Sequence, residues 1–134
     1  MSRGIDMSLI FSNLDVRELE GAYRQLINPF QFYDSLVGGV EVPAGFICDY
    51  ESVPWIRGTS KRAGVGHDYF YRFDSIPVVS KEVADRIYLN LMKALRVGYC
   101  RRYIKYNAVK YFGAPSYHRL SVNSDLEEIK NANN

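Results

Sequence analysis

The sequence has only two cysteines, Cys48 and Cys100, among its 134 residues. A small secreted scaffold usually carries four or more, and these two follow neither a Cys-x-x-Cys nor a Cys/His metal pattern. We therefore expect both to stay reduced, with no disulfide between them. The sequence also lacks any apolar run near the roughly 20 residues of a membrane-spanning helix, and residues 1–6 lack the apolar core of a signal peptide. We therefore expect synthesis in a cytoplasm.

The sequence also has little excess of positive over negative charge. There are 17 lysine and arginine residues against 15 aspartate and glutamate residues, a formal net charge of +2. This balance is too small to indicate a nucleic-acid partner. Hydrophobic residues make up 47% of the chain and aromatic residues 14%, enough for the core of one domain. We predict a single α+β domain over residues 1–120 and a loose polar tail over residues 121–134.

The N-terminal half is rich in strand formers that turn residues separate. Short strands are predicted over residues 22–27, 30–33, 39–42 and 46–48, and residues 8–11 could add another. Residues 13–20 are predicted as either a turn of helix or a loop. The connections are too short for parallel crossovers, so the pattern indicates a small antiparallel β-meander. A long loop, from residue 49 to residue 66, follows it.

The C-terminal half has helical periodicity. A first helix is predicted from about Gly64 to Arg72, a second over residues 81–96 with Ser80 as its N-cap, and a third over residues 99–112. Gly98 is expected just after the end of the second helix. The fold class is therefore α+β: a small N-terminal antiparallel β-meander followed by a bundle of about three helices.

The third predicted helix carries two sets of side chains. Its apolar positions fall on one face, and its basic positions are typical of a solvated helix face rather than of a phosphate site. The apolar set is Ile104, Ala108 and Tyr111, and the basic set is Arg101, Arg102 and Lys105.

The densest polar and aromatic cluster runs from His67 to Arg72, directly after Gly66. If the first two helices pack as antiparallel neighbours, Asp85 can face His67. An aspartate that accepts a hydrogen bond from one ring nitrogen orients the imidazole and leaves the other nitrogen as a general base. The Tyr71 hydroxyl is the next nearest donor to Asp85. The alternative is a buried histidine in a purely architectural pair, and the sequence leaves both open.

Asp68 points about 100° away from His67 around the helix, because each residue of a helix turns by that angle. It could hold a metal ion together with oxygens from the loop that contains Asp49. A hard cation such as calcium suits carboxylate, carbonyl and water ligands. Calcium, if it binds, is then expected to raise the melting temperature through Asp68.

Four segments, in this order and spacing, resemble one known family. They are Val42–Pro54, Gly66–Arg72, Ala84–Tyr88 and Tyr106–Gly113. They resemble the phage and prophage domain-of-unknown-function family 1353, over about residues 22–113. The resemblance implies a bacteriophage or prophage origin, often near virion structural genes, and no established reaction.

The segment His67-Asp-Tyr-Phe-Tyr71 is similar to the His-Asp-x-Cys-Tyr signature of phospholipase A2, and closer still to the bacterial form, His-Asp-Phe-Gly-Tyr-Arg. This resemblance implies His67 as the base, Asp85 as the residue that orients it, Tyr71 as support for that aspartate and Asp68 as a calcium ligand. Asp49 would lie where a calcium loop supplies a ligand. The cysteine of the signature is Phe70 here, so the corresponding disulfide is absent.

Two classes of function follow. One is a virion-associated structural or accessory protein, a tail or head component that assembles with other virion proteins as an oligomer and resides in the particle after assembly in the host cytoplasm. The other is a metal-assisted hydrolase of a lipid ester, or of a cell-envelope bond such as one in peptidoglycan. The two are compatible, since phage particles carry enzymes.

Overall fold

The structure, a computed structural model, describes residues 6–21, 23–48 and 61–132. Its order of elements is α+β, as the sequence predicts: strands come first and helices follow. The strands are β1 (Ser8–Ile10), β2 (Val16–Glu18), β3 (Arg24–Leu26), β4 (Phe30–Asp34), β5 (Gly38–Val42) and β6 (Ile47–Cys48). The helices are α1 (Lys61–Tyr71), α2 (Lys81–Ala94), α3 (Tyr99–Phe112) and α4 (Leu126–Ala132), with a 3-10 turn at Ala114–Ser116.

The strands form two antiparallel sheets instead of one continuous meander. One sheet has the order β1-β4-β5 and the other the order β2-β3-β6. The hairpin β4-β5 is the local pairing that the sequence predicts, whereas β6 returns to pair with β3, with Arg24 opposite Cys48. Strand β2 falls within residues 13–20, for which the sequence predicts a helical turn or a loop. Its pairing with β3 overrides the weak local preference.

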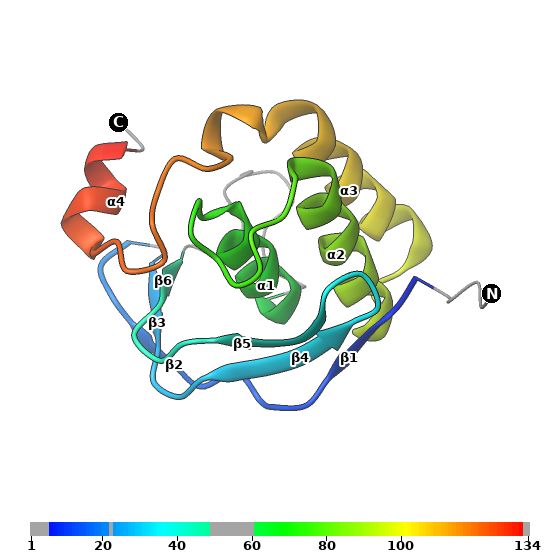
Figure 1. The fold of residues 1–134 in the computed structure, drawn as a ribbon, viewed down its shortest axis with the longest axis horizontal. Coiled ribbons are helices and arrows are strands. Elements are labelled where there is room, and N and C mark those ends of the chain that lie inside the picture. The colour runs from blue at the N-terminus through cyan, green and yellow to red at the C-terminus, as the bar shows by residue number, and fades with distance from the viewer. Residues whose placement is uncertain (1–5, 22, 49–60, 133–134) are drawn as a thin grey trace.

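The sheet β1-β4-β5 lies beneath α1 and α2, and α3 packs on the outer side of α2 (Figure 1). Along β4 the inward and outward side chains alternate, so Phe30, Phe32 and Asp34 are buried while Gln31 and Tyr33 are exposed. This two-residue period gives the sheet one apolar face for the helices to cover.

A buried carboxylate fastens this sheet to α2. Asp34 is fully buried at the end of β4, and its Oδ2 accepts hydrogen bonds from Ser8 Oγ at 2.5 Å and from Asn90 Nδ2 at 3.1 Å. Its Oδ1 accepts from the Leu36 amide at 2.8 Å. Strand β1, the β4-β5 turn and α2 are thus joined at one point, because a buried carboxylate needs several donors.

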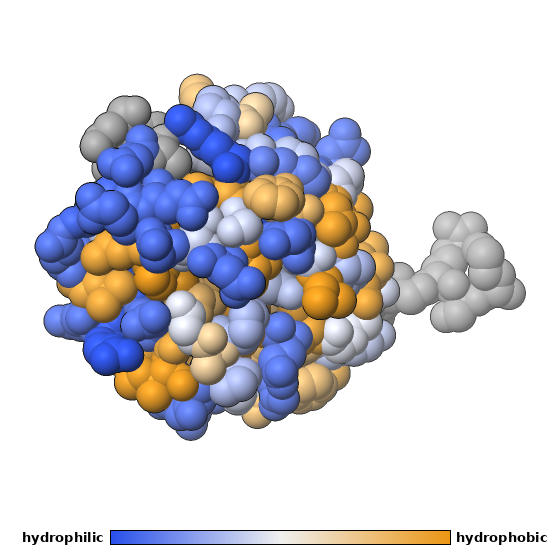
Figure 2. Space-filling view, turned by 60° about the vertical axis from the view of Figure 1, so that its left-hand side comes forward, coloured by the Kyte–Doolittle hydropathy of each residue, from blue (hydrophilic) through white to orange (hydrophobic). Residues whose placement is uncertain are grey.

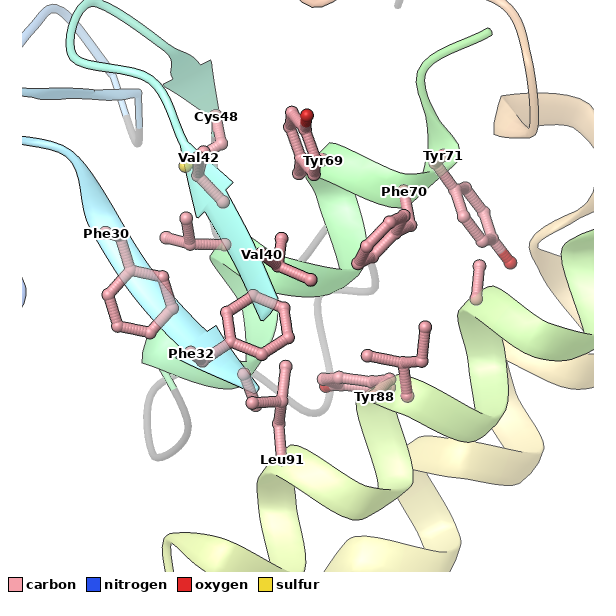
Figure 3. Packing of buried hydrophobic residues seen from close by; sticks show 14 of the residues in the cluster. Phe30, Phe32, Val40, Val42, Cys48, Tyr69, Phe70, Tyr71, Tyr88 and Leu91 are labelled. Carbon is pink, nitrogen blue, oxygen red and sulfur yellow. The ribbon is translucent and has the colours of Figure 1, made fainter. Parts of the chain in front are cut away.

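The core lies between the sheet and the first two helices (Figure 3). Phe32 from β4 meets the edge of Phe70 from α1, with ring centroids 6.3 Å apart. Tyr88 and Leu91 complete the cluster from α2, and both are buried. Burying aromatic and aliphatic side chains on three elements is the main force that fixes α1 against α2.

The helix boundaries differ from the sequence prediction at two points. In the described residues helix α1 (Lys61–Tyr71) reaches back to Lys61, about one turn before Gly64. At the other end, α2 ends at Ala94 and Arg96 follows with a left-handed backbone (φ 59°), so Gly98, expected just after this helix, is instead the N-cap of α3. The Ser80 N-cap of α2 is confirmed, since its hydroxyl accepts from the Val83 amide at 3.2 Å.

Burial on α3 also departs from the expected faces. Ala108 is buried, but Ile104 and Tyr111 are exposed. Lys105, expected on a solvated face, is 1% exposed, whereas Arg101 is exposed. The residues that the sequence placed in a polar tail include α4, where Ile129 is buried and Asp125 accepts from the Glu128 amide at 2.8 Å as a local cap.

On the face shown in Figure 2, hydrophobic side chains form several separate patches between hydrophilic ones. Cys48 is buried in β6 and Cys100 is exposed on α3, and the two do not form a disulfide. Within the described part of the chain, none of the helices is long and apolar enough to span a membrane.

Candidate active site

The candidate site lies where α1 crosses α2. His67 follows Gly66, whose hydrogen faces Leu91 on α2: a β-carbon at position 66 would stand 2.5 Å from Leu91 Cδ1 and 3.3 Å from the Phe32 ring. The glycine therefore lets α1 approach α2 and the sheet closely. This close approach brings His67 and Asp85 to the same interface.

His67 and Asp85 are hydrogen-bonded, as the sequence predicts. Nε2 of His67 lies 2.9 Å from Oδ1 of Asp85. The Tyr71 hydroxyl, one turn after His67 on α1, donates to the same oxygen at 2.6 Å. Two of the three side chains that the sequence singled out, His67 and Tyr71, therefore converge on one carboxylate oxygen of the third, Asp85.

Lys81 binds the second oxygen of the same carboxylate. Its Nζ lies 2.7 Å from Oδ2 of Asp85 and also donates to the carbonyls of Val109 and Lys110, at 2.9 and 3.1 Å. Lys81 thus ties Asp85 to the last turn of α3, where the negative end of the helix dipole favours a cation.

The electrostatics keep Asp85 ionised. Burial alone would raise the pKa of this carboxyl, but hydrogen bonds from His67, Lys81 and Tyr71 and the attraction of His67 outweigh burial, and the net pKa is lowered. The same surroundings act in reverse on Tyr71: burial, the hydrogen bond to Asp85 and the charge of Asp85 raise the pKa of its hydroxyl. Tyr71 is therefore a neutral donor to a charged acceptor.

The His67 ring lies between two tyrosines. Its centroid is 4.1 Å from that of Tyr71 and 4.6 Å from that of Tyr88, and its side chain is 11% exposed. Because an ionised Asp85 can only accept, Nε2 carries the hydrogen in the neutral imidazole and Nδ1 keeps the lone pair. Among the described residues, Nδ1 has no hydrogen-bond partner.

Asp68 points away from this cluster, as the helical period predicts, and pairs with Arg72. Its Oδ2 lies 3.3 Å from Nη2 of Arg72. Arg72 is 3% exposed and is held by the carbonyls of Ile47 and Ser121 and by the Phe46 ring. The guanidinium is therefore a fixed part of the fold.

The calcium ligands predicted from the sequence are not brought together in the described part of the chain. Asp49 lies outside the described residues. Asp68 already faces a buried positive charge, and no group of three or more ligand-type side chains occurs within the described ranges. The pairing of Asp68 with Asp49 around a calcium ion therefore stays a prediction, and an ion at Asp68 would have to compete with the Arg72 guanidinium.

A pocket of about 820 Å³ adjoins the site between the first half of α2 and the second half of α3. Lys81 and Asp85 line it, together with Tyr106 and Lys110, whereas His67 does not. The pocket therefore reaches the side of the carboxylate that faces away from the imidazole.

Three supporting residues were not found from the sequence. Lys81 lies four residues before Asp85, a spacing at which opposite charges meet on a helix, so this signal was present. Tyr88 contacts the His67 ring, but in the sequence nothing distinguishes it from the other aromatic residues of the core. Gly113 is the C-cap of α3, and its contact with Tyr71 depends on tertiary packing that no local pattern encodes.

Comparison with curated proteins gave no match, and comparison with solved structures gave none either. One family model matches, over residues 24–109, and its description reads "Protein of unknown function (DUF1353)". The match spans the segment from β3 to the last turns of α3, and therefore includes His67, Tyr71 and Asp85. Since more than half of the chain matches, the protein belongs to the DUF1353 family.

Proposed function

We propose that this protein is a hydrolase in which His67 is the general base. One observation carries the proposal: Asp85 accepts the hydrogen bond of Nε2, which leaves the lone pair of Nδ1 as the basic position on a side chain that is 11% exposed. Asp85 orients the ring and stabilises the imidazolium that forms when Nδ1 accepts a proton. Tyr71 and Lys81 hold the carboxylate in place.

The reaction that suits this arrangement is the hydrolysis of an ester. Nδ1 of His67 takes a proton from water as the water oxygen attacks the carbonyl carbon. The imidazolium then returns the proton to the leaving alkoxide, so that an acid and an alcohol are formed and the imidazole is restored. The similarity of the His67–Arg72 segment to the phospholipase A2 signature supports a lipid ester as the first substrate class, with a cell-envelope bond as the second.

The test is turnover of acyl esters by purified protein and by variants of the site. His67→Ala is expected to abolish hydrolysis, and Asp85→Asn to lower kcat by about 100-fold or more, the range of general-base catalysis. His118→Asn is the matched control. It changes the other histidine, and asparagine tolerates the left-handed backbone at that position (φ 58°). Equal activity in the wild type and in His67→Ala, both folded by circular dichroism, would refute the proposal.

A second candidate, a structural or accessory component of a phage particle, is favoured by the exposed apolar surface. Ile76, Val78 and Phe73 are 78%, 58% and 51% exposed on the connection between α1 and α2. Side chains of this kind gathered on one loop are typical of contact surfaces. Quantitative mass spectrometry of purified phage particles tests it: a fixed, whole-number copy number per particle supports this role, and absence from the particle excludes it.

A further inference from the structure

The charges of this chain are divided unevenly along the sequence. Residues 93–124 contain seven lysine and arginine side chains and no aspartate or glutamate, so this segment carries +7. The remaining ten basic and fifteen acidic residues give the rest of the chain −5. The small net charge of +2 therefore conceals a strongly basic segment, and α3 lies at its centre.

Helix α3 also exposes large apolar side chains. Tyr99, Ile104, Tyr111 and Phe112 are 68%, 55%, 69% and 66% exposed. Between and beside them stand the exposed cations of the helix, which has no acidic residue. We call this surface the α3 face; it consists of Tyr99, Arg101, Ile104, Lys110, Tyr111 and Phe112.

At each end of α3 an exposed tyrosine of this face lies beside a cation of the helix. At the start of the helix, the Arg102 guanidinium lies 5.3 Å from the Tyr99 ring centroid. Near its end, Nζ of Lys110 lies 5.5 Å from the Tyr111 ring centroid. The two pairs stand roughly 15 Å apart along the helix, so the face is wide rather than a single point of attachment.

We propose that the α3 face binds the surface of an anionic lipid bilayer. Arginine and lysine side chains attract lipid phosphates, tyrosine rings favour the headgroup region, and side chains such as Ile104 and Phe112 gain by entering the acyl boundary. The acidic remainder of the chain is repelled by the same surface, which orients the protein with α3 toward the lipid. This binding goes beyond the proposed hydrolysis and needs no turnover.

Two other partners suit the face less well. A second copy of the chain would bring two α3 faces together and set basic helix against basic helix, which electrostatics opposes. A nucleic acid would pair with the cations and could stack on the tyrosines, but it offers Ile104 no apolar environment. A bilayer surface accommodates the cations, the rings and the aliphatic side chain together.

The experiment is co-sedimentation of the full chain with vesicles of phosphatidylcholine, alone or mixed with phosphatidylglycerol. We expect binding to the mixed vesicles, weaker binding to the neutral ones, and a loss of binding as salt rises. Arg101→Glu is expected to lower the partition coefficient about 25-fold, since it removes one positive charge and adds one negative charge, and each charge near an anionic surface changes binding about fivefold. Arg17→Glu is the matched control on exposed β2, with the same change in net charge and no expected effect beyond about twofold.

The apolar contribution has its own matched pair. Ile104 and Ile27 are 55% and 54% exposed, on α3 and after β3 respectively. Ile104→Ser is expected to weaken binding to mixed vesicles severalfold, while Ile27→Ser leaves it unchanged. Equal effects of the two members of either pair, or equal binding to neutral and anionic vesicles, would overturn the proposal. The proposal would also be overturned if the protein bound a single-stranded oligonucleotide through Arg101 but did not bind vesicles.

Discussion

Gly113 lies directly against the hydroxyl of Tyr71: a β-carbon at position 113 would stand 2.5 Å from that oxygen. The same β-carbon would be 2.5 Å from the carbonyl oxygen of Val109, a backbone atom that cannot move aside cheaply. Because the Tyr71 hydroxyl donates to Asp85 at 2.6 Å, the glycine that ends α3 keeps open the space for a hydrogen bond of the candidate site.

Gly113→Ala is therefore expected to lower the free energy of unfolding by about 1–3 kcal/mol, the usual cost of overpacking. It should also displace the Tyr71 hydroxyl from Asp85. Urea unfolding followed by circular dichroism measures the first effect, and tyrosine absorbance the second. Gly39→Ala is the control, since a β-carbon at position 39 meets nothing within 4 Å. Equal stability of the two variants would contradict the contact.

The approach of α1 to α2 at Gly66 gives a second prediction. Gly66→Ala should destabilise the protein by about 1–3 kcal/mol, because its methyl group would overlap Leu91 and press on Phe32. Leu91→Ala alone should cost about 2–5 kcal/mol by leaving a cavity. In the double variant the new methyl group enters that cavity, so the loss in unfolding free energy should be smaller than the sum of the two single losses. Strict additivity would show that the two positions do not share space.

The sequence predicts the helices better than the sheets, for a physical reason. The period of α2, its Ser80 cap and the glycine after α3 are local signals, and all three are present in the structure. The pairing of β6 with β3 is not local, since it joins residues more than twenty positions apart, and no two-residue alternation specifies a partner.

The candidate site shows the same division. The contact between His67 and Asp85 could be predicted because their helices are sequence neighbours joined by a short connection, and helix packing then leaves few arrangements. The contact of Tyr71 with Gly113 could not be predicted, because it depends on how the end of α3 packs against α1. The pairing of Asp68 with Arg72 could have been predicted from their i, i+4 spacing on a helix, but the burial of Arg72 could not be predicted from the sequence.

The lowered pKa of Asp85 predicts how stability depends on pH. An aspartate whose pKa is lower in the folded state contributes stability above its ordinary pKa, and that contribution is lost as the pH falls through the folded-state pKa. At neutral pH, Asp85→Asn is expected to cost about 2 kcal/mol of unfolding free energy, the scale of hydrogen bonds to a charged group. The difference from the wild type should shrink as the pH falls below about 4.

Urea unfolding at a series of pH values measures this difference. Glu127→Gln, an exposed change in the first turn of α4, should follow the wild-type curve within error. A difference between wild type and Asp85→Asn that stays constant down to low pH would show that the carboxylate is not held in its charged form.

The last prediction concerns calcium at Asp68. The side chain faces the Arg72 guanidinium at 3.3 Å, and Arg72 cannot turn away without losing its bonds to the carbonyls of Ile47 and Ser121. An ion at Asp68 would therefore meet a fixed positive charge. We expect millimolar calcium to leave the melting temperature unchanged in the wild type and in Asp68→Asn alike. A true site would be visible, since a ligand at 100 times its Kd adds about 2.7 kcal/mol, or several degrees for a chain of this size. A calcium-dependent rise in Tm that disappears in Asp68→Asn would show that the ion displaces Arg72 and that Asp68 is a ligand after all.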